Sequence, residues 1–149
     1  MRSGRVPKAP WTTSKIEGEL RDPTEEATLV SRTQVESLTL AAGETLSLVI
    51  TEPELSPPRL TLLCLHGWTL DHRSFASQAV LADAGVRVVC FDRRGFGLST
   101  LRPDFEREAE DVRAVLARFS GALVLYGVSQ GARLALRCAV AFEDVLAGV

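Results

Sequence analysis

The stretch ALVLYGVSQGARLALRCAVA, residues 122–141, decides the fold that we expect for this chain. It opens with an apolar run of strand length at residues 122–126. It closes with an Ala- and Leu-rich run at residues 132–141, which predicts a buried helix. Between the two lies a G-x-S-x-G turn around Ser129. We therefore predict that Ser129 lies at the tip of a strand–turn–helix, in a strained backbone conformation.

The residue that follows the serine is Gln130, and its backbone N–H is expected in the first turn of the helix. Amides in that turn have no intrahelical partner, and the helix dipole favours negative charge beside them. Two glycines and a serine at this spacing arise by chance in roughly a few per cent of chains of this length, so the flanking strand and helix are what support the interpretation.

Composition limits the function classes. The chain has 149 residues, enough for one hydrophobic core and too few for two domains. Apolar residues make up 46% and charged residues 24%, which is ordinary for a globular protein in water. The net charge of −2 favours neither nucleic acid nor an anionic membrane as a partner. No apolar run reaches the length of a membrane span, and the basic N-terminus lacks the apolar core of a secretory signal.

The cysteines Cys64, Cys90 and Cys138 lie inside apolar runs at irregular spacing. An odd number of such residues argues against a disulfide framework and for a reducing compartment, so we expect a cytoplasmic protein with cysteines in its core. The sequence contains no metal-ligand cluster or Gly-rich phosphate loop, and we expect no cofactor.

The N-terminal residues 1–33 are polar, contain three prolines and lack periodicity, which predicts a flexible arm before a domain at residues 34–149. Apolar positions at residues 35–40 and 46–50 then predict a β-hairpin.

Strands and helices alternate along the rest of the chain. Strands are predicted at residues 60–65, 86–91 and 122–126, helices at residues 74–84, 103–119 and 132–141, and the opening of another strand at residues 145–149. The second helix carries an apolar stripe that we expect to face the core, made of Phe105, Ala109, Val112, Leu116 and Phe119. This alternation predicts an α/β fold, with a mostly parallel sheet, flanking helices and the hairpin at its N-terminal edge. In such sheets ligands bind at the carboxyl ends of the strands.

Three motifs together resemble the α/β-hydrolase superfamily. LCLHGW at residues 63–68 is similar to the family's strand and His-Gly oxyanion loop, FDRRGFGLS at residues 91–99 to its D-x-R-G-x-G-x-S signature, and LYGVSQGA at residues 125–132 to its nucleophile elbow. The resemblance covers about residues 35–149, the N-terminal half of that fold. Within the family, the esterase, lactonase and cofactor-free haloperoxidase-like branch is the most similar.

The resemblance implies roles for particular residues. Ser129 matches the catalytic nucleophile, and the backbone N–H groups of Trp68 and Gln130 match the oxyanion hole. The implied reaction is acyl transfer from an ester, thioester or lactone, with a small-molecule acyl substrate and an acyl-serine intermediate.

Three other polar residues receive structural roles. His66 matches a loop-shaping residue of the family and not its catalytic base, and His72 is expected to face solvent. Asp92 precedes the elbow, whereas the family's acid follows it, so we expect Asp92 to brace the turn at residues 93–95.

The family's triad runs in the order serine, acid, histidine, and no histidine follows Ser129. We therefore expect a triad incomplete in this chain, no activity of the chain alone, and either a fragment of a longer hydrolase or a truncated gene product. An inactive pseudoenzyme and a non-catalytic small-ligand-binding module remain alternatives. The apolar strand at residues 122–126 is expected at or near a sheet edge, which makes self-association possible.

Overall fold

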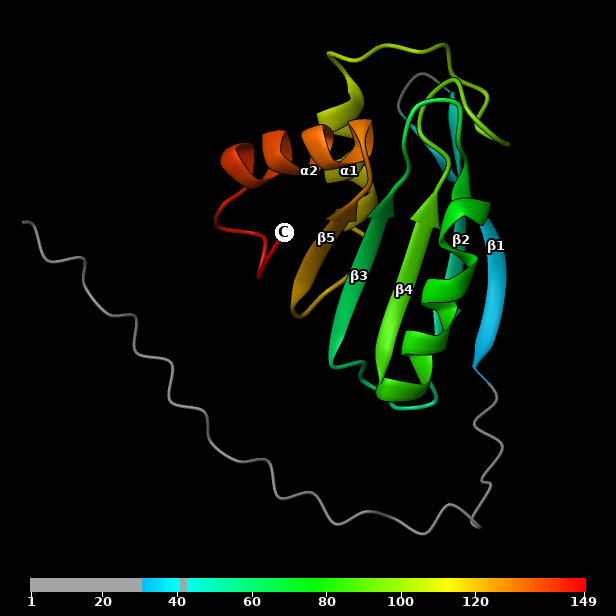
Figure 1. Ribbon diagram of the computed structural model, residues 1–149, viewed down its shortest axis with the longest axis vertical. Coiled ribbons are helices and arrows are strands. Elements are labelled where there is room, and N and C mark those ends of the chain that lie inside the picture. The colour runs from blue at the N-terminus through cyan, green and yellow to red at the C-terminus, as the bar shows by residue number, and fades with distance from the viewer. Residues whose placement is uncertain (1–30, 41–42) are drawn as a thin grey trace, which may run out of the picture.

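The computed structural model describes residues 31–40 and 43–149. Within them, five strands form one sheet in the order β1-β2-β4-β3-β5 (Figure 1). The strands are β1 (Arg32–Thr39), β2 (Thr45–Glu52), β3 (Leu60–Leu65), β4 (Val86–Phe91) and β5 (Leu123–Gly127). β2 pairs antiparallel with β1 and β4, whereas β3 pairs in parallel with β4 and β5. The predicted α/β fold with an N-terminal hairpin is thereby confirmed.

Helices cover both faces of the sheet (Figure 1). They are η1 (His72–Ala84), α1 (Glu108–Leu116) and α2 (Gln130–Ala141). Because successive side chains of a strand point to opposite faces, β3 contributes to two cores. Leu63 and Leu65 join the core under α1 and α2, and Cys64 packs in a smaller cluster with Phe75 of η1.

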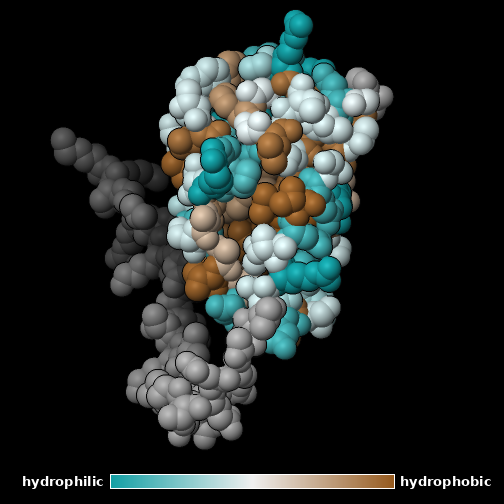
Figure 2. All heavy atoms as spheres, turned by 90° about the vertical axis from the view of Figure 1, so that its right-hand side faces the viewer, coloured by the Kyte–Doolittle hydropathy of each residue, from teal (hydrophilic) through white to brown (hydrophobic). Residues whose placement is uncertain are grey.

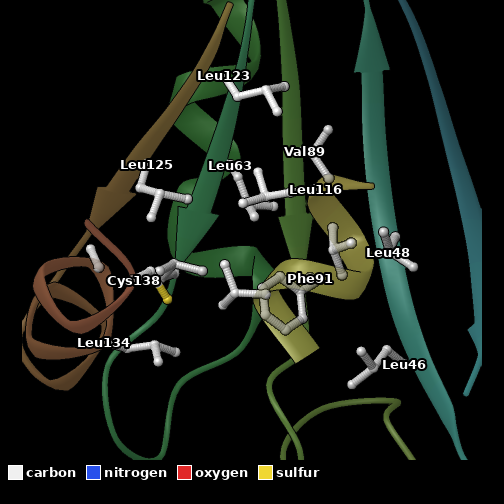
Figure 3. Close-up of a cluster of buried hydrophobic side chains, with 14 of the residues drawn as sticks. Leu46, Leu48, Leu63, Val89, Phe91, Leu116, Leu123, Leu125, Leu134 and Cys138 are labelled. Atoms are coloured by element: carbon white, nitrogen blue, oxygen red, sulfur yellow. The ribbon is translucent and has the colours of Figure 1, made fainter. Parts of the chain in front are cut away.

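The larger core lies between the sheet and the pair α1 and α2 (Figure 3). It is built from buried side chains of four strands and both helices, including Leu46, Leu48, Leu63, Val89, Phe91, Leu116, Leu123, Leu125, Leu134 and Cys138. All three cysteines are buried and free, as predicted. Among the described helices, none has the length and apolar character needed to cross a bilayer.

The β1 edge of the sheet is polar. Its residues alternate between exposed and half-buried positions along RTQVESLT, and Arg32 and Glu36 place charges on the strand. Figure 2 views the molecule from this side and shows hydrophobic groups bordered by hydrophilic ones. Charges on an edge strand discourage pairing with a further strand. β1 begins two residues before the predicted domain boundary at residue 34, and most of the predicted arm lies outside the described residues.

The helix predicted at residues 74–84 is a 3₁₀ helix and begins at His72. The side chain of Asp71 caps it by accepting a hydrogen bond from the Arg73 backbone N–H at 2.9 Å. The helix ends at Gly85, whose φ of 83° is readily available only to glycine.

The helix predicted from residue 103 begins five residues later, at Glu108. Residues 104–107 form a turn in which the Arg107 N–H donates to the Asp104 carbonyl. This turn takes Phe105 out of the apolar stripe that we expected to face the core. Phe105 is 45% exposed and packs its ring against Trp68, at 5.4 Å between ring centroids. The prediction of Phe105 as a core residue is therefore wrong.

The helix after the elbow is found where it was predicted, but it is not buried all round. α2 turns Leu134, Ala135 and Cys138 inward, whereas Leu136 is 62% exposed and Val140 is 84% exposed. Only one face of α2 meets the sheet and α1, so its opposite face lies in solvent.

The predicted strand at residues 145–149 is present as the start of a parallel pairing with β5. The Leu125 N–H donates to the Gly148 carbonyl at 3.0 Å, and the Ala147 N–H donates to the Leu123 carbonyl at 2.7 Å. A single parallel bridge joins Val124 and Gly148. The outer side of β5 is thus only partly covered by the described residues.

Candidate active site

The predicted nucleophile, Ser129, lies between the end of β5 and the first residue of α2. Its backbone has φ 55° and ψ −117°, outside the regions that non-glycine residues usually adopt, and the residue is exposed. The Val128 N–H donates to the Leu65 carbonyl at 3.1 Å, which fixes the turn to the end of β3. The prediction of a strained serine at a strand–turn–helix tip is confirmed.

The two glycines of the turn are required by close backbone approach. A Cβ at Gly131 would lie 1.9 Å from the Leu65 carbonyl oxygen, and a Cβ at Gly127 would lie 2.4 Å from the Gly131 carbonyl oxygen. Neither distance is possible for a real side chain. The G-x-S-x-G spacing therefore lets α2 start directly against the end of β3.

The loop after β3 runs beside the elbow. A Cβ at Gly67 would lie 3.4 Å from the Ser129 Cβ, so the peptide that leads into Trp68 is next to the serine. Within the described part of the chain, the hydrogen bonds outside regular helices and strands include none donated by the backbone N–H of Trp68 or Gln130. This placement fits the oxyanion-hole assignment, and the convergence of the two N–H groups on one oxygen stays a prediction.

The indole of Trp68 holds this loop against two neighbouring segments. It contacts Phe96 edge-on, with centroids 5.1 Å apart and an interplanar angle of 75°, and it also packs against Phe105. Aromatic pairs in this geometry contribute about 0.5–1.5 kcal/mol beyond the area that they bury. Aromatic side chains from the loop after β3 and from the connection between β4 and α1 thus support the peptide beside Ser129.

His66 is fully buried, and both of its ring nitrogens are engaged. Nε2 accepts a hydrogen bond from the Arg93 N–H at 3.0 Å, so the proton is on Nδ1, which donates to the Gly67 carbonyl at 2.8 Å. Burial lowers the pKa of His66 below its usual range, and the nearby Arg93 charge acts in the same direction. A neutral imidazole with both nitrogens occupied shapes the loop and offers no base to Ser129.

Two buried ion pairs connect the loop after β4 to α1. Arg93 donates to the Glu108 carboxylate at 2.6 Å and to the His66 carbonyl at 2.8 Å, and Arg94 contacts Asp111 at 2.5 Å. All four charged side chains are at most 5% exposed. Burial raises the pKa of Glu108, and the Arg93 charge opposes this shift.

These ion pairs were not foreseen from the sequence. Their members are 15 and 17 residues apart and belong to a loop and to a helix that began later than predicted. The one available signal was the acidic first turn of the helix that follows the Arg93-Arg94 dipeptide.

Asp92 and His72 require corrections. Asp92 is fully buried and accepts hydrogen bonds from the His72 N–H at 2.8 Å, from His72 Nδ1 at 2.9 Å and from the Leu98 N–H at 2.8 Å. Asp92 therefore has the expected structural role, but its carboxylate connects residues 72 and 98 and does not bind the turn at residues 93–95. His72 does not simply face solvent, because the early start of η1 brings it onto this carboxylate.

The Ser129 hydroxyl has no side-chain hydrogen-bond partner among residues 31–40 and 43–149, and both histidines of the chain are bound elsewhere. The same residues bring no three His, Cys, Asp or Glu side chains together as metal ligands. The arrangement presents an exposed serine beside the loop after β3, and the Trp68 and Gln130 N–H groups donate no hydrogen bond to the described residues.

The comparison with family models identifies the group. The model described as "Alpha/beta hydrolase family" matches residues 62–149, more than half of the chain. The chain belongs to the α/β-hydrolase family. The match includes β3 with its loop, the braced loop after β4, and the elbow.

A curated relative and several solved structures are similar to the chain. AB hydrolase superfamily protein YisY of Bacillus subtilis is 37% identical over 82 residues, which are 51% of this chain and 30% of that protein. An α/β hydrolase from Novosphingobium aromaticivorans is 29% identical with a TM-score of 0.66, over 79% of this chain and 43% of that one. The Pyrococcus furiosus esterase Pf2001 shares the fold, with a TM-score of 0.68 and 20% identity over 79% of this chain and 51% of that one. The chain thus spans about a third to a half of the length of these relatives.

Proposed function

We propose that this chain carries the nucleophile and the oxyanion hole of a serine hydrolase that acts on an ester, thioester or lactone. Ser129 attacks the acyl carbon and forms an acyl-serine, and the N–H groups of Trp68 and Gln130 stabilise the oxyanion. Each such donor contributes about 3 kcal/mol to the transition state. The observation that carries the proposal is the strained backbone of Ser129 at the junction of β5 and α2.

We further propose that these 149 residues alone do not turn over substrate. Serine is a weak nucleophile and needs a general base. The chain has two histidines; His66 uses both ring nitrogens in the loop, and His72 is bound to Asp92. An acid and a base supplied from outside these residues would complete the triad.

A serine-reactive fluorophosphonate probe tests the proposal. We expect slow labelling at Ser129, located by mass spectrometry and accelerated by added imidazole, which substitutes for the missing base. The exposed Ser120 is the matched control: Ser120→Ala should leave the labelling intact, whereas Ser129→Ala should abolish it. Labelling that is spread evenly over exposed serines would contradict a reactive elbow.

Hydrolysis of a p-nitrophenyl ester tests the second part. We expect no turnover above background without imidazole. Turnover that Ser129→Ala abolishes would show that a base lies within the chain. His72 would be the first candidate, because its imidazole is 22% exposed.

One alternative has specific support. Both histidines are hydrogen-bonded to groups other than Ser129, which also fits a non-catalytic module that binds a small ligand at the elbow. Complete resistance of Ser129 to the probe at every imidazole concentration would favour that alternative.

A further inference from the structure

A groove opens beside the elbow, between α2 and the segment that leads into α1. Its volume is about 280 Å³. It is lined by Arg93, Phe105, Glu106, Glu108, Gln130, Arg133, Leu134 and Arg137. Because Gln130 directly follows Ser129, the groove begins next to the proposed nucleophile and runs along α2.

The charges of the lining do not cancel. Glu108 is neutralised by its buried contact with Arg93. Glu106 lies 3.8 Å from Arg137, and its side chain is 92% exposed, so this contact is weak. Among the described residues, no carboxylate lies within 4.0 Å of the Arg133 guanidinium. The groove therefore retains a positive charge one helical turn from the elbow.

Three polar side chains of α2 face this groove in a row. Gln130, Arg133 and Arg137 are spaced by three and four residues, which places them on one face of the helix. Arg137 is held in place by a 2.8 Å hydrogen bond from Nη1 to the Phe105 carbonyl.

We propose that the groove binds the anionic end of the acyl substrate, and that this substrate is a short acyl group with a terminal carboxylate. Guanidinium groups bind carboxylates and phosphates through charge-assisted hydrogen bonds. A carboxylate is favoured over a phosphate dianion, because the three arginines and two glutamates of the lining leave one net positive charge, which a monoanion neutralises and a dianion exceeds. The orientation of the substrate rests on the proposed function; the binding itself needs no reactive serine.

Saturation-transfer difference NMR with monomethyl glutarate, an acyl ester with one free carboxylate, tests the proposal on the full chain. We expect monomethyl glutarate to bind with a measurable Kd and its neutral counterpart dimethyl glutarate to bind at least about tenfold more weakly, as expected for the loss of charge-assisted contacts. Arg133→Gln should weaken monomethyl glutarate binding about tenfold, and Arg137→Gln should weaken it too. The matched control is Arg102→Gln, an exposed arginine outside the groove, which should leave the Kd unchanged.

Three results would overturn the proposal: equal binding of monomethyl glutarate and dimethyl glutarate, no effect of Arg133→Gln, or tighter binding of inorganic phosphate than of monomethyl glutarate. Arg133 is exposed, so its replacement should leave folding intact, and a circular dichroism melt checks this. Ser129→Ala should bind monomethyl glutarate as the parent chain does. Failure of the carboxylate site is thereby distinguishable from failure of the serine chemistry.

Discussion

The loops after β3 and β4 and the outer side of β5 and α2 are built in opposite ways. In the loops, the charges of Asp92, Arg93 and Arg94 are buried, and each contacts an oppositely charged or hydrogen-bonding partner. On the outer side, Leu136 and Val140 of α2 are exposed. There, the described residues pair with the free side of β5 through one bridge and two backbone hydrogen bonds.

The difference shows which part of the site the chain builds by itself. The braced loops need nothing further to place the peptide before Trp68 beside Ser129. The other side presents an apolar surface, and we expect it to be covered by additional protein, either further chain or a second copy. Substitutions should therefore lower the free energy of unfolding strongly in the loops after β3 and β4, the braced side. They should change it little on the outer side of β5 and α2, the open side.

The largest effect is expected where the two sides meet, at Gly131. Gly131→Ala places a Cβ 1.9 Å from the Leu65 carbonyl oxygen, so β3 or α2 must move. We expect a loss of about 5 kcal/mol or more, a large part of the roughly 5–15 kcal/mol net stability of a protein domain. Urea unfolding followed by circular dichroism measures it.

Gly148→Ala is the matched control on the open side. Its new methyl group would find its nearest neighbours 3.9 Å away, which is ordinary contact, and the change should be within about 0.5 kcal/mol. Similar losses for the two variants would show that the junction relaxes and is not closely packed.

The next effect concerns the buried pair of Arg93 and Glu108. Glu108→Ala leaves a buried guanidinium without its carboxylate, and we expect a loss of about 3–5 kcal/mol in the free energy of unfolding. Glu110→Ala, which removes a 76% exposed carboxylate from the same helix, should cost less than about 0.5 kcal/mol.

The double variant Arg93→Met/Glu108→Leu distinguishes charge from packing. Replacing both members of a buried ion pair by apolar groups is often neutral, so this variant should recover most of the loss. If Glu108→Ala lowers the free energy of unfolding by less than about 1 kcal/mol, the loop after β4 does not depend on its buried ion pair with α1, and the comparison above is wrong.

A smaller, pH-dependent effect is expected at His66. Its pKa in the folded chain is lowered by burial, so the unfolded chain binds the proton more tightly. The contribution of His66 is therefore fully present above about pH 6.5 and is lost as the pH falls below that value. The structural reason is that a protonated imidazole cannot accept the hydrogen bond of the Arg93 N–H.

Urea midpoints between pH 7.5 and pH 5.0 measure this contribution. The parent chain should lose stability across this range relative to His66→Gln, which has no imidazole to titrate. Glu108, whose raised pKa acts in the opposite direction, is present in both proteins and cancels in the difference. Parallel pH profiles would show that folding leaves the proton affinity of His66 unchanged, which would contradict a lowered pKa of His66 in the folded chain.

The sequence predicted the elements that depend on local pattern. β3 and β4 were located to the residue, and the elbow was recognised, because glycine spacing and apolar runs are visible in the chain itself. The pairing of Asp92 with His72 could not be predicted, since it depends on where η1 begins. The exposure of Val140 could not be predicted either, because composition does not show which face of an apolar helix meets the sheet.

The smallest effect on stability, and the sharpest test of the open side, is expected from Val140→Lys. Val140 is 84% exposed, so the substitution removes almost no buried apolar area and should change the free energy of unfolding by less than about 0.5 kcal/mol. A lysine on that face should nevertheless reduce self-association, because it puts a charge into the apolar surface through which copies would meet. Val35→Lys on the β1 edge, where the valine is 65% exposed, is the control and should leave association unchanged. Sedimentation velocity separates the two variants. A parent chain that is already a monodisperse monomer would mean that the pairing of Gly148 with β5 suffices to close this side, and the small-ligand-binding alternative would gain support.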